Sequence, residues 1–331
     1  MEQIWLRKRH TWHVGSVDVT VSMVPEVAER VRASAVYQRF VKPLRGRREP
    51  VVPVKAITVI RPIDEEGAGL LERVNAMEWY QTIDLGHGVV TPGTVDHRTQ
   101  VSFYGLSSSM EGMRVLDVGT YDGFWAFEFE RRGAEVVALD VATWVDGEVP
   151  QRMKPHAAEF GLDVPTGTAF ALAAEALGSK VKRVEAPIHD VTPEMLGQFD
   201  LVFVSDVLVH LRCPQLALER LASVCAGEMI VADVFTPMLE GFGELPFAQY
   251  AAPSHHWWIP NVKTLWSWMN VAGMDAIEEV SRFELQTSLA EPIHKVVLRG
   301  TMNTLPPWLV AYRDWALTTS PKWKSAEEQP V

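Results

Sequence analysis

The chain has 331 residues, 47 % hydrophobic and 22 % charged, which is typical of a folded protein with a substantial core. Its formal net charge of −11 disfavours nucleic acid as a partner, because such partners require a basic excess that neutralises phosphates. The two cysteines, Cys213 and Cys225, form no metal-binding or disulfide pattern, and no apolar run reaches the about 18 residues that cross a bilayer, so we expect a cytoplasmic protein without a membrane anchor.

Residues 1–95 are predicted to form an N-terminal extension that contributes a lid. Apolar residues at helical spacing predict helices over 24–37 and 66–80. The glycines and prolines of 79–93 indicate turns around a short extended piece. The basic cluster Lys42, Arg45, Arg47 and Arg48 is interpreted as a solvated loop, with nucleic-acid contact as the less favoured reading.

From residue 113 onward, short apolar runs alternate with helical patterns, which predicts a parallel sheet with crossover helices. Residues 96–305 are therefore assigned to a Rossmann-like α/β domain with a seven-stranded sheet, and 306–331 to a C-terminal tail. Residues 141–180 are too long for a plain crossover and are read as an inserted segment with helices over 153–160 and 168–177. Predicted strands cover 113–119, 135–140, 181–190, 199–206 and 228–234, with a final antiparallel pair at 276–285 and from Ile293; further helices cover 122–132, 214–223 and 262–272.

The turn after the first of these strands carries the strongest cofactor motif. Gly119 and Gly123 let the backbone approach a ligand and let the following helix pack on the strand. Because Tyr121 stands where dinucleotide-binding loops have a glycine, the turn suits the amino-acid end of S-adenosylmethionine (SAM) better than a pyrophosphate. NAD or FAD, or no cofactor at all, remain the alternatives. The predicted cofactor-binding residues of this turn are Asp117, Gly119, Thr120, Tyr121 and Gly123.

Polar residues also end the other predicted parallel strands, where ligands of such sheets bind. Asp140 is placed to accept hydrogen bonds from a ribose diol. Asp190 falls near the expected adenine position, and Ser205 and Asp206 face the same crevice. The sequence therefore predicts one nucleoside site across several strand ends.

Several segments resemble one group of class I SAM-dependent methyltransferases, which includes the bacterial tRNA wobble-uridine carboxymethyltransferases. The similar segments lie at 79–93 (WYQTIDLGHGVVTPG), 116–134 (LDVGTYDGFWAFEFERRGA), 202–221 (VFVSDVLVHLRCPQLALERL) and 257–274 (WWIPNVKTLWSWMNVAGM). The resemblance spans roughly residues 75–275 and implies a SAM-dependent methyltransferase that releases S-adenosylhomocysteine. It also places Tyr80 beside the SAM pocket.

The chain departs from this group at two positions. The tRNA enzymes use a carboxylated SAM and pair its extra carboxylate with a lysine, where this chain has Thr99. They also carry a tyrosine where this chain has Val209, before His210. An unpaired buried carboxylate costs several kcal/mol. We therefore expect ordinary SAM and a small-molecule acceptor, with a tRNA-modifying enzyme and a non-catalytic SAM-binding protein as alternatives, and a NAD-linked oxidoreductase as a distant further one.

Acceptor-side residues are predicted from chemistry alone. A histidine is the usual base when the acceptor is a hydroxyl, an acidic carbon or a protonated amine. Tryptophans suit the wall of a pocket for a flat or apolar acceptor, although each also suits a packing role. No metal site is expected, and the sequence leaves open whether the chain forms a homodimer. The candidate catalytic residues are His97, His210, His255 and His256, and the candidate acceptor-binding residues are Trp144, Trp257 and Trp258.

Overall fold

The computed structural model divides the chain into two units. One comprises residues 1–56 with Thr236–Gly243, and the other Ile57–Phe235 with Glu244–Val331. The residues that the structure describes are 8–14, 17–23, 62–159, 163–250, 256–288 and 293–302. The helix predicted over 24–37, the basic cluster near residue 45, His255 and the tail beyond Met302 lie outside them.

The first unit contains a β-hairpin that the sequence analysis did not predict. Strand β1 (Lys8–Val14) pairs antiparallel with β2 (Val17–Met23). The same unit holds the short 3₁₀ helix η8 (Pro237–Phe242).

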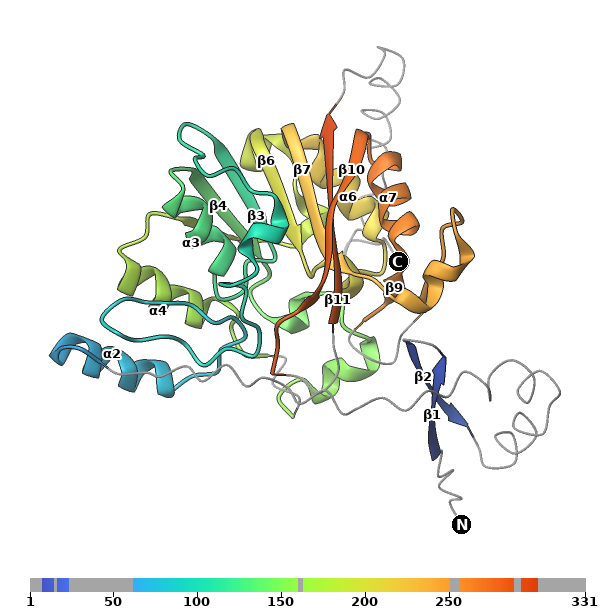
Figure 1. The fold of residues 1–331 in the computed structure, drawn as a ribbon. Helices are drawn as coiled ribbons and strands as arrows, with labels where there is room; N and C mark the ends of the chain where they lie inside the picture. The colour runs from blue at the N-terminus through green and yellow to red at the C-terminus, as the bar shows by residue number, and fades with distance from the viewer. Residues whose placement is uncertain are drawn as a thin grey trace, which may run out of the picture. The chain divides into compact units, whose positions relative to one another are not determined.

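The second unit is built on a seven-stranded sheet in the order β10-β11-β7-β6-β3-β4-β5 (Figure 1). The five strands from β7 to β5 are parallel, whereas β11 runs antiparallel to both β7 and β10. The predicted seven-stranded Rossmann-like fold is thus confirmed. The strands are β3 (Arg114–Val118), β4 (Glu135–Asp140), β5 (Lys182–Glu185), β6 (Phe199–Ser205), β7 (Cys225–Val234), β10 (Met274–Leu285) and β11 (Ile293–Met302).

The helices begin where the sequence carries start signals. Pro214 occupies the first turn of α6, where its missing N–H costs no hydrogen bond. Asn261 caps α7 by accepting a hydrogen bond from Thr264 N at 3.0 Å. The α-helices are α2 (Glu65–Asn75), α3 (Phe124–Arg131), α4 (Gly167–Leu177), α5 (Pro193–Leu196), α6 (Pro214–Ser223) and α7 (Val262–Val271).

Short elements fill the connections. The small strands β8 (Ala248–Tyr250) and β9 (Trp258–Pro260) form an antiparallel pair. The 3₁₀ helices of this unit are η3 (Val101–Tyr104), η4 (Trp144–Asp146), η5 (Gln151–His156), η6 (Ile188–Asp190) and η7 (Leu208–His210).

Three predicted elements are wrong in extent. The helix predicted over 66–80 ends at Asn75, where the Trp79 indole folds back and donates a hydrogen bond to Val74 O at 3.0 Å. The strand predicted over 181–190 ends at Glu185, because the chain turns into η6 after Pro187. The helix predicted from residue 153 is the 3₁₀ helix η5, which contains Pro155 and so lacks an N–H that a longer helix requires.

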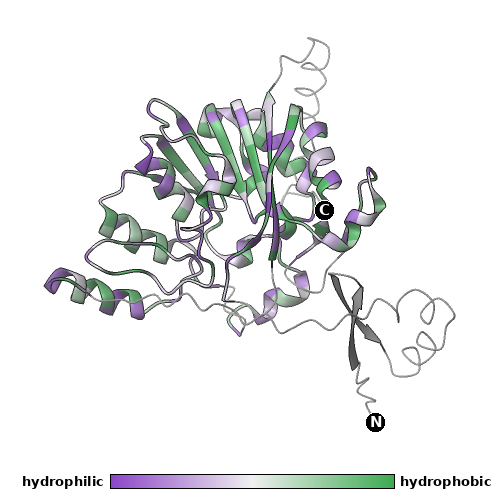
Figure 2. Ribbon diagram, in the orientation of Figure 1, coloured by the Kyte–Doolittle hydropathy of each residue, from purple (hydrophilic) through white to green (hydrophobic). Residues whose placement is uncertain are grey.

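Alternate residues of the central strands build two separate cores, one on each face of the sheet. On β3, Leu116 and Val118 belong to the core shared with α6 and α7, while Val115 belongs to the core shared with α3 and α4. On β6, Val202 and Phe203 divide in the same way. This period of two is the pattern of a strand buried on both faces, and Figure 2 shows these strands as largely hydrophobic.

Candidate cofactor and acceptor site

The turn between β3 and α3 requires both of its glycines. Gly119 has φ +72° and Gly123 has φ +98°, in the left-handed region that side chains disfavour. A Cβ atom on Gly119 would lie 2.3 Å from Val207 Cγ2, and one on Gly123 would lie 2.5 Å from the Phe127 ring. The glycines therefore let this loop approach the loop after β6 and let α3 pack closely.

Asp117 lies at the floor of this turn with its carboxyl group buried. Its Oδ2 atom has no hydrogen-bond partner among the described residues. Burial, with a smaller contribution from the nearby Asp140 carboxyl, raises the pKa of Asp117 to about 7. A buried carboxyl oxygen without a hydrogen-bond partner is costly, so this position favours a cationic ligand group such as an ammonium.

The strap, defined here as residues 79–96, is fastened onto the same turn. Asp122 Oδ2 accepts hydrogen bonds from the backbone N–H groups of Tyr80 and Gln81, both at 2.7 Å. In return, Gln81 Oε1 accepts from Phe124 N at 2.9 Å and so caps the first turn of α3. Burial raises the pKa of Asp122 to about 6, although the two backbone donors oppose this rise. Sequence reasoning missed Asp122 and Gln81, whose partners lie more than 40 residues away.

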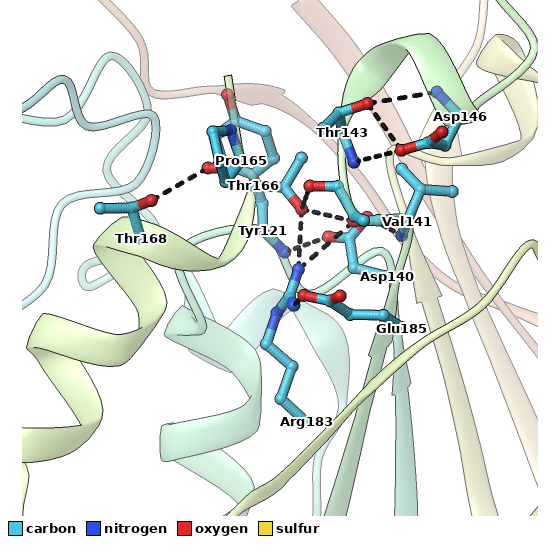
Figure 3. Close-up of polar contacts among 11 residues, drawn as sticks. Tyr121, Asp140, Val141, Thr143, Asp146, Pro165, Thr166, Thr168, Arg183 and Glu185 are labelled. Atoms are coloured by element: carbon cyan, nitrogen blue, oxygen red, sulfur yellow. Dashed lines mark hydrogen bonds and ion pairs between the residues drawn. The ribbon is translucent and has the colours of Figure 1, made fainter. Parts of the chain in front are cut away.

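Asp140 ends β4, beside the glycine turn (Figure 3). Its Oδ2 accepts from Tyr121 N and its Oδ1 accepts from Val141 N, each at 2.8 Å. Burial raises the pKa of Asp140, and the Arg183 guanidinium partly offsets this. Each carboxylate oxygen has further acceptor capacity, so the pair of oxygens is suited to a diol.

The insertion after Asp140 is tied back to the sheet by Arg183 of β5. One guanidinium nitrogen of Arg183 donates to Thr166 Oγ1 at 2.7 Å and to Val141 O at 3.3 Å, and another pairs with Glu185 (Figure 3). Thr166 N also donates to Ala142 O at 2.9 Å. These contacts fix the start of the insertion beside the predicted ribose position.

A second polar cluster lies at the carboxyl ends of β6 and β7. The Lys295 ammonium of β11 donates to Asp206 Oδ2 at 2.6 Å and to Ser205 Oγ at 2.9 Å. Asp233 is also buried, with both oxygens accepting from the backbone N–H groups of Leu208 and Val234. Burial and the neighbouring Asp206 carboxylate raise the pKa of Asp233. Sequence reasoning missed Lys295, since a lysine inside an apolar strand gives no sign of which strand faces it.

His97 lies deep beneath the strap. Its ring contacts Phe124 and Trp125, and its Nδ1 atom is 3.2 Å from the Tyr104 hydroxyl. Burial, with a smaller contribution from the positive charge of Lys295, lowers the pKa of His97 to about 3. A packing role accounts for this position.

A row of aromatic rings connects the strap to the predicted acceptor side. Ring centroids are 5.4 Å apart for Tyr80 and Tyr121, and 6.2 Å for Tyr121 and Trp144. The row continues from Trp144 to His210 at 5.3 Å and from His210 to His256 at 5.0 Å. Residues predicted separately as cofactor, acceptor and catalytic groups are therefore neighbours.

The other predicted residues are not part of this row of rings. The Trp257 indole donates to Glu148 O and its ring lies under the Arg212 guanidinium at 4.5 Å, while the Trp258 indole donates to Arg212 O at 2.9 Å. Both tryptophans thus hold loops together. Asp190 lies on η6 with its side chain exposed. No cluster of three or more metal-ligating side chains occurs within the described ranges, and no helix described there could span a membrane.

The strand order, the reversed β11 and a glycine turn flanked by carboxylates define a class I methyltransferase fold. Residues 99–279 match the family model described as a methyltransferase domain. The chain belongs to this family. Family membership agrees with SAM as the cofactor, as the sequence predicted.

Individual relatives are distant. The chain is 28 % identical over 178 residues to the tRNA U34 carboxymethyltransferase of Syntrophotalea carbinolica. The matched segment covers 52 % of this chain and 48 % of the relative. It is 29 % identical over 111 residues to the magnesium-protoporphyrin O-methyltransferase of Rhodobacter capsulatus, and this match covers 34 % of this chain and 39 % of the relative. The chain thus spans about half or less of these curated relatives. Among solved structures, the N-terminal domain of EvdMO1 with S-adenosylhomocysteine bound matches with a TM-score of 0.47 and 16 % identity, covering 71 % of this chain and 97 % of that one.

Proposed function

We propose that this SAM-dependent methyltransferase acts on a small, flat or apolar acceptor. The observation that carries the donor site is the buried carboxyl group of Asp117 beside the glycine turn, with an unsatisfied oxygen that matches the ammonium of SAM. Asp140, on the strand that neighbours the one carrying Asp117, accepts hydrogen bonds from the ribose hydroxyl groups. The sulfonium then lies over the ends of β3 and β6, beneath Tyr80 of the strap.

The bound cofactor supplies an activated methyl group, and the chain positions the donor relative to the acceptor. Asp117 and Asp140 hold the two ends of the donor, so that the methyl group points toward the acceptor side. The rings of Tyr80 and Tyr121 cover the crevice and favour a cation through their negative faces. The acidic surroundings favour the positively charged donor over the neutral product.

On the acceptor side, Trp144, His210 and His256 form the wall against which the acceptor lies. Their edge-on and tilted rings suit a planar molecule. His210 or His256 accepts the proton when the acceptor is a hydroxyl or an ammonium group. The net charge of −11 and the carboxylates of the crevice disfavour the phosphates of tRNA.

Radiolabel transfer tests this proposal. The protein is incubated with methyl-tritiated SAM and either total bacterial tRNA or a protein-free small-molecule extract of bacterial cells. We expect label in organic-soluble products of the extract and none in tRNA. An Asp117→Asn variant, checked for folding by thermal unfolding, serves as the control that must transfer less label at a SAM concentration below saturation. Labelled tRNA with an unlabelled extract would contradict the proposal and favour the tRNA alternative.

A further inference from the structure

The crevice floor beside β6 contains a buried ammonium group that is already matched by a carboxylate. Lys295 is the sole lysine or arginine with a buried side chain among the side chains that the structure describes. It is 0 % exposed, while its partner Asp206 retains 16 % exposure. Asp206 is therefore the partner of this ion pair that retains exposure.

Asp206 holds this position despite an unfavourable backbone conformation. Its φ of +59° lies in the left-handed region, where glycine is favoured and other residues carry strain. The 2.6 Å ion pair with Lys295 stabilises the strained residue. A glycine would fit this backbone without strain, but it would leave the Lys295 ammonium facing the crevice without its carboxylate partner.

The charge of such a pair matters for a donor whose transferable group is itself charged. A relative named as a carboxymethyltransferase moves a group whose carboxylate lies one bond beyond the transferred carbon. A crevice for such a donor needs a cation at that place. At the end of β6 the charge that retains exposure is the carboxylate of Asp206, and the Lys295 ammonium is occupied by it. Thr99, where the resemblance places a cation, is exposed and donates to Gln286 Oε1 at 2.8 Å.

We infer that Asp206 determines donor specificity: by neutralising Lys295, it makes the crevice accept a methyl sulfonium and reject a carboxymethyl sulfonium. This inference rests on the proposed position of SAM over β3 and β6. It assigns Lys295 a positioning role, since its ammonium acts through Asp206 and does not touch the donor.

Binding measurements on the full chain test the inference without a known acceptor. Calorimetry compares SAM with the analogue in which a carboxymethyl group replaces the sulfonium methyl. The proteins are the natural chain, Asp206→Gly, Asp206→Asn, and the double variant Asp206→Gly with Lys295→Met. Thermal unfolding checks each one. Asp206→Asn retains the side-chain shape, so it replaces the glycine variant if that variant does not fold.

We expect the natural chain to prefer SAM by at least about tenfold, as one repelled buried charge implies. Removing the Asp206 charge should shift the ratio of the two dissociation constants toward the analogue by at least about tenfold. Removing Lys295 as well should abolish that shift. Equal binding of both donors by the natural chain, or an unchanged ratio in the Asp206 variants, overturns the inference. Binding of neither donor by the natural chain instead contradicts the proposed donor site itself.

Discussion

SAM binding should release protons from Asp117, and the amount can be worked out from its position. With a pKa of about 7, the carboxyl group is roughly half protonated at pH 7 in the free protein. An ammonium bound against Oδ2 favours the charged form and lowers that pKa. Binding at pH 7 should therefore release roughly 0.5 proton from this group, falling to nearly zero at pH 8.5, where Asp117 is already ionised.

Calorimetry in buffers of different ionisation enthalpy measures this release. The slope of the observed binding enthalpy against the buffer ionisation enthalpy gives the number of protons exchanged. Because the amino group of SAM also titrates just above neutral pH, the informative quantity is the natural chain minus Asp117→Asn. That difference should be about 0.5 at pH 7, and the variant should bind SAM about 1–3 kcal/mol more weakly. Equal slopes in both proteins would refute the assignment of the ammonium to Asp117.

Three further predictions concern neighbouring groups. Asp140→Ala should weaken SAM binding by about 1–3 kcal/mol in calorimetry, because it removes charge-assisted hydrogen bonds to the ribose; unchanged affinity would mean that the ribose lies elsewhere. The contribution of Asp117 to the stability of the free protein should fall as pH rises from about 4 to 7, by up to about 1.4 kcal/mol per pH unit, because its raised pKa makes the folded state bind more protons than the unfolded state. Denaturant unfolding at pH 5.5 and 8 should show that the natural chain loses more stability over this range, or gains less, than Asp117→Asn. Gln81→Ala should speed amide hydrogen exchange at Phe124 with little change in the sheet, and equal exchange would show that the cap contributes nothing.

Much of the fold was predictable because its signals are local. Buried parallel strands appear as apolar runs, and a turn that needs left-handed backbone selects glycine at Gly119 and Gly123. The errors fall where a distant contact decides the end of an element. The Trp79 indole ends α2 by bonding its last turn, and nothing in the local pattern of 66–80 shows that contact.

The candidate site divides in the same way. Asp117 and Asp140 could be picked out from the ends of apolar runs, and the structure places Asp117 next to the last residue of β3 and Asp140 at the end of β4; their roles toward a donor stay predictions. Lys295 could not be predicted, because its meaning depends on β11 lying beside β7 and on Asp206 turning toward it. Trp257 was assigned to the acceptor wall because it is aromatic, yet its hydrogen bond to Glu148 fits a loop-holding role.

The charge balance of the crevice links these residues to one purpose. Carboxyl groups converge on it from β3, β4, β6 and β7, while the buried ammonium among the described residues is Lys295. The free site therefore carries an excess of negative charge whose burial raises the pKa of Asp117, Asp122 and Asp140. A donor with a sulfonium and an ammonium relieves that excess, whereas the product has lost the sulfonium charge. Electrostatics alone thus favours the donor over the product, so the natural chain should bind SAM more tightly than S-adenosylhomocysteine. The reverse order of affinities would show that the carboxylates do not interact with the charge on the sulfur.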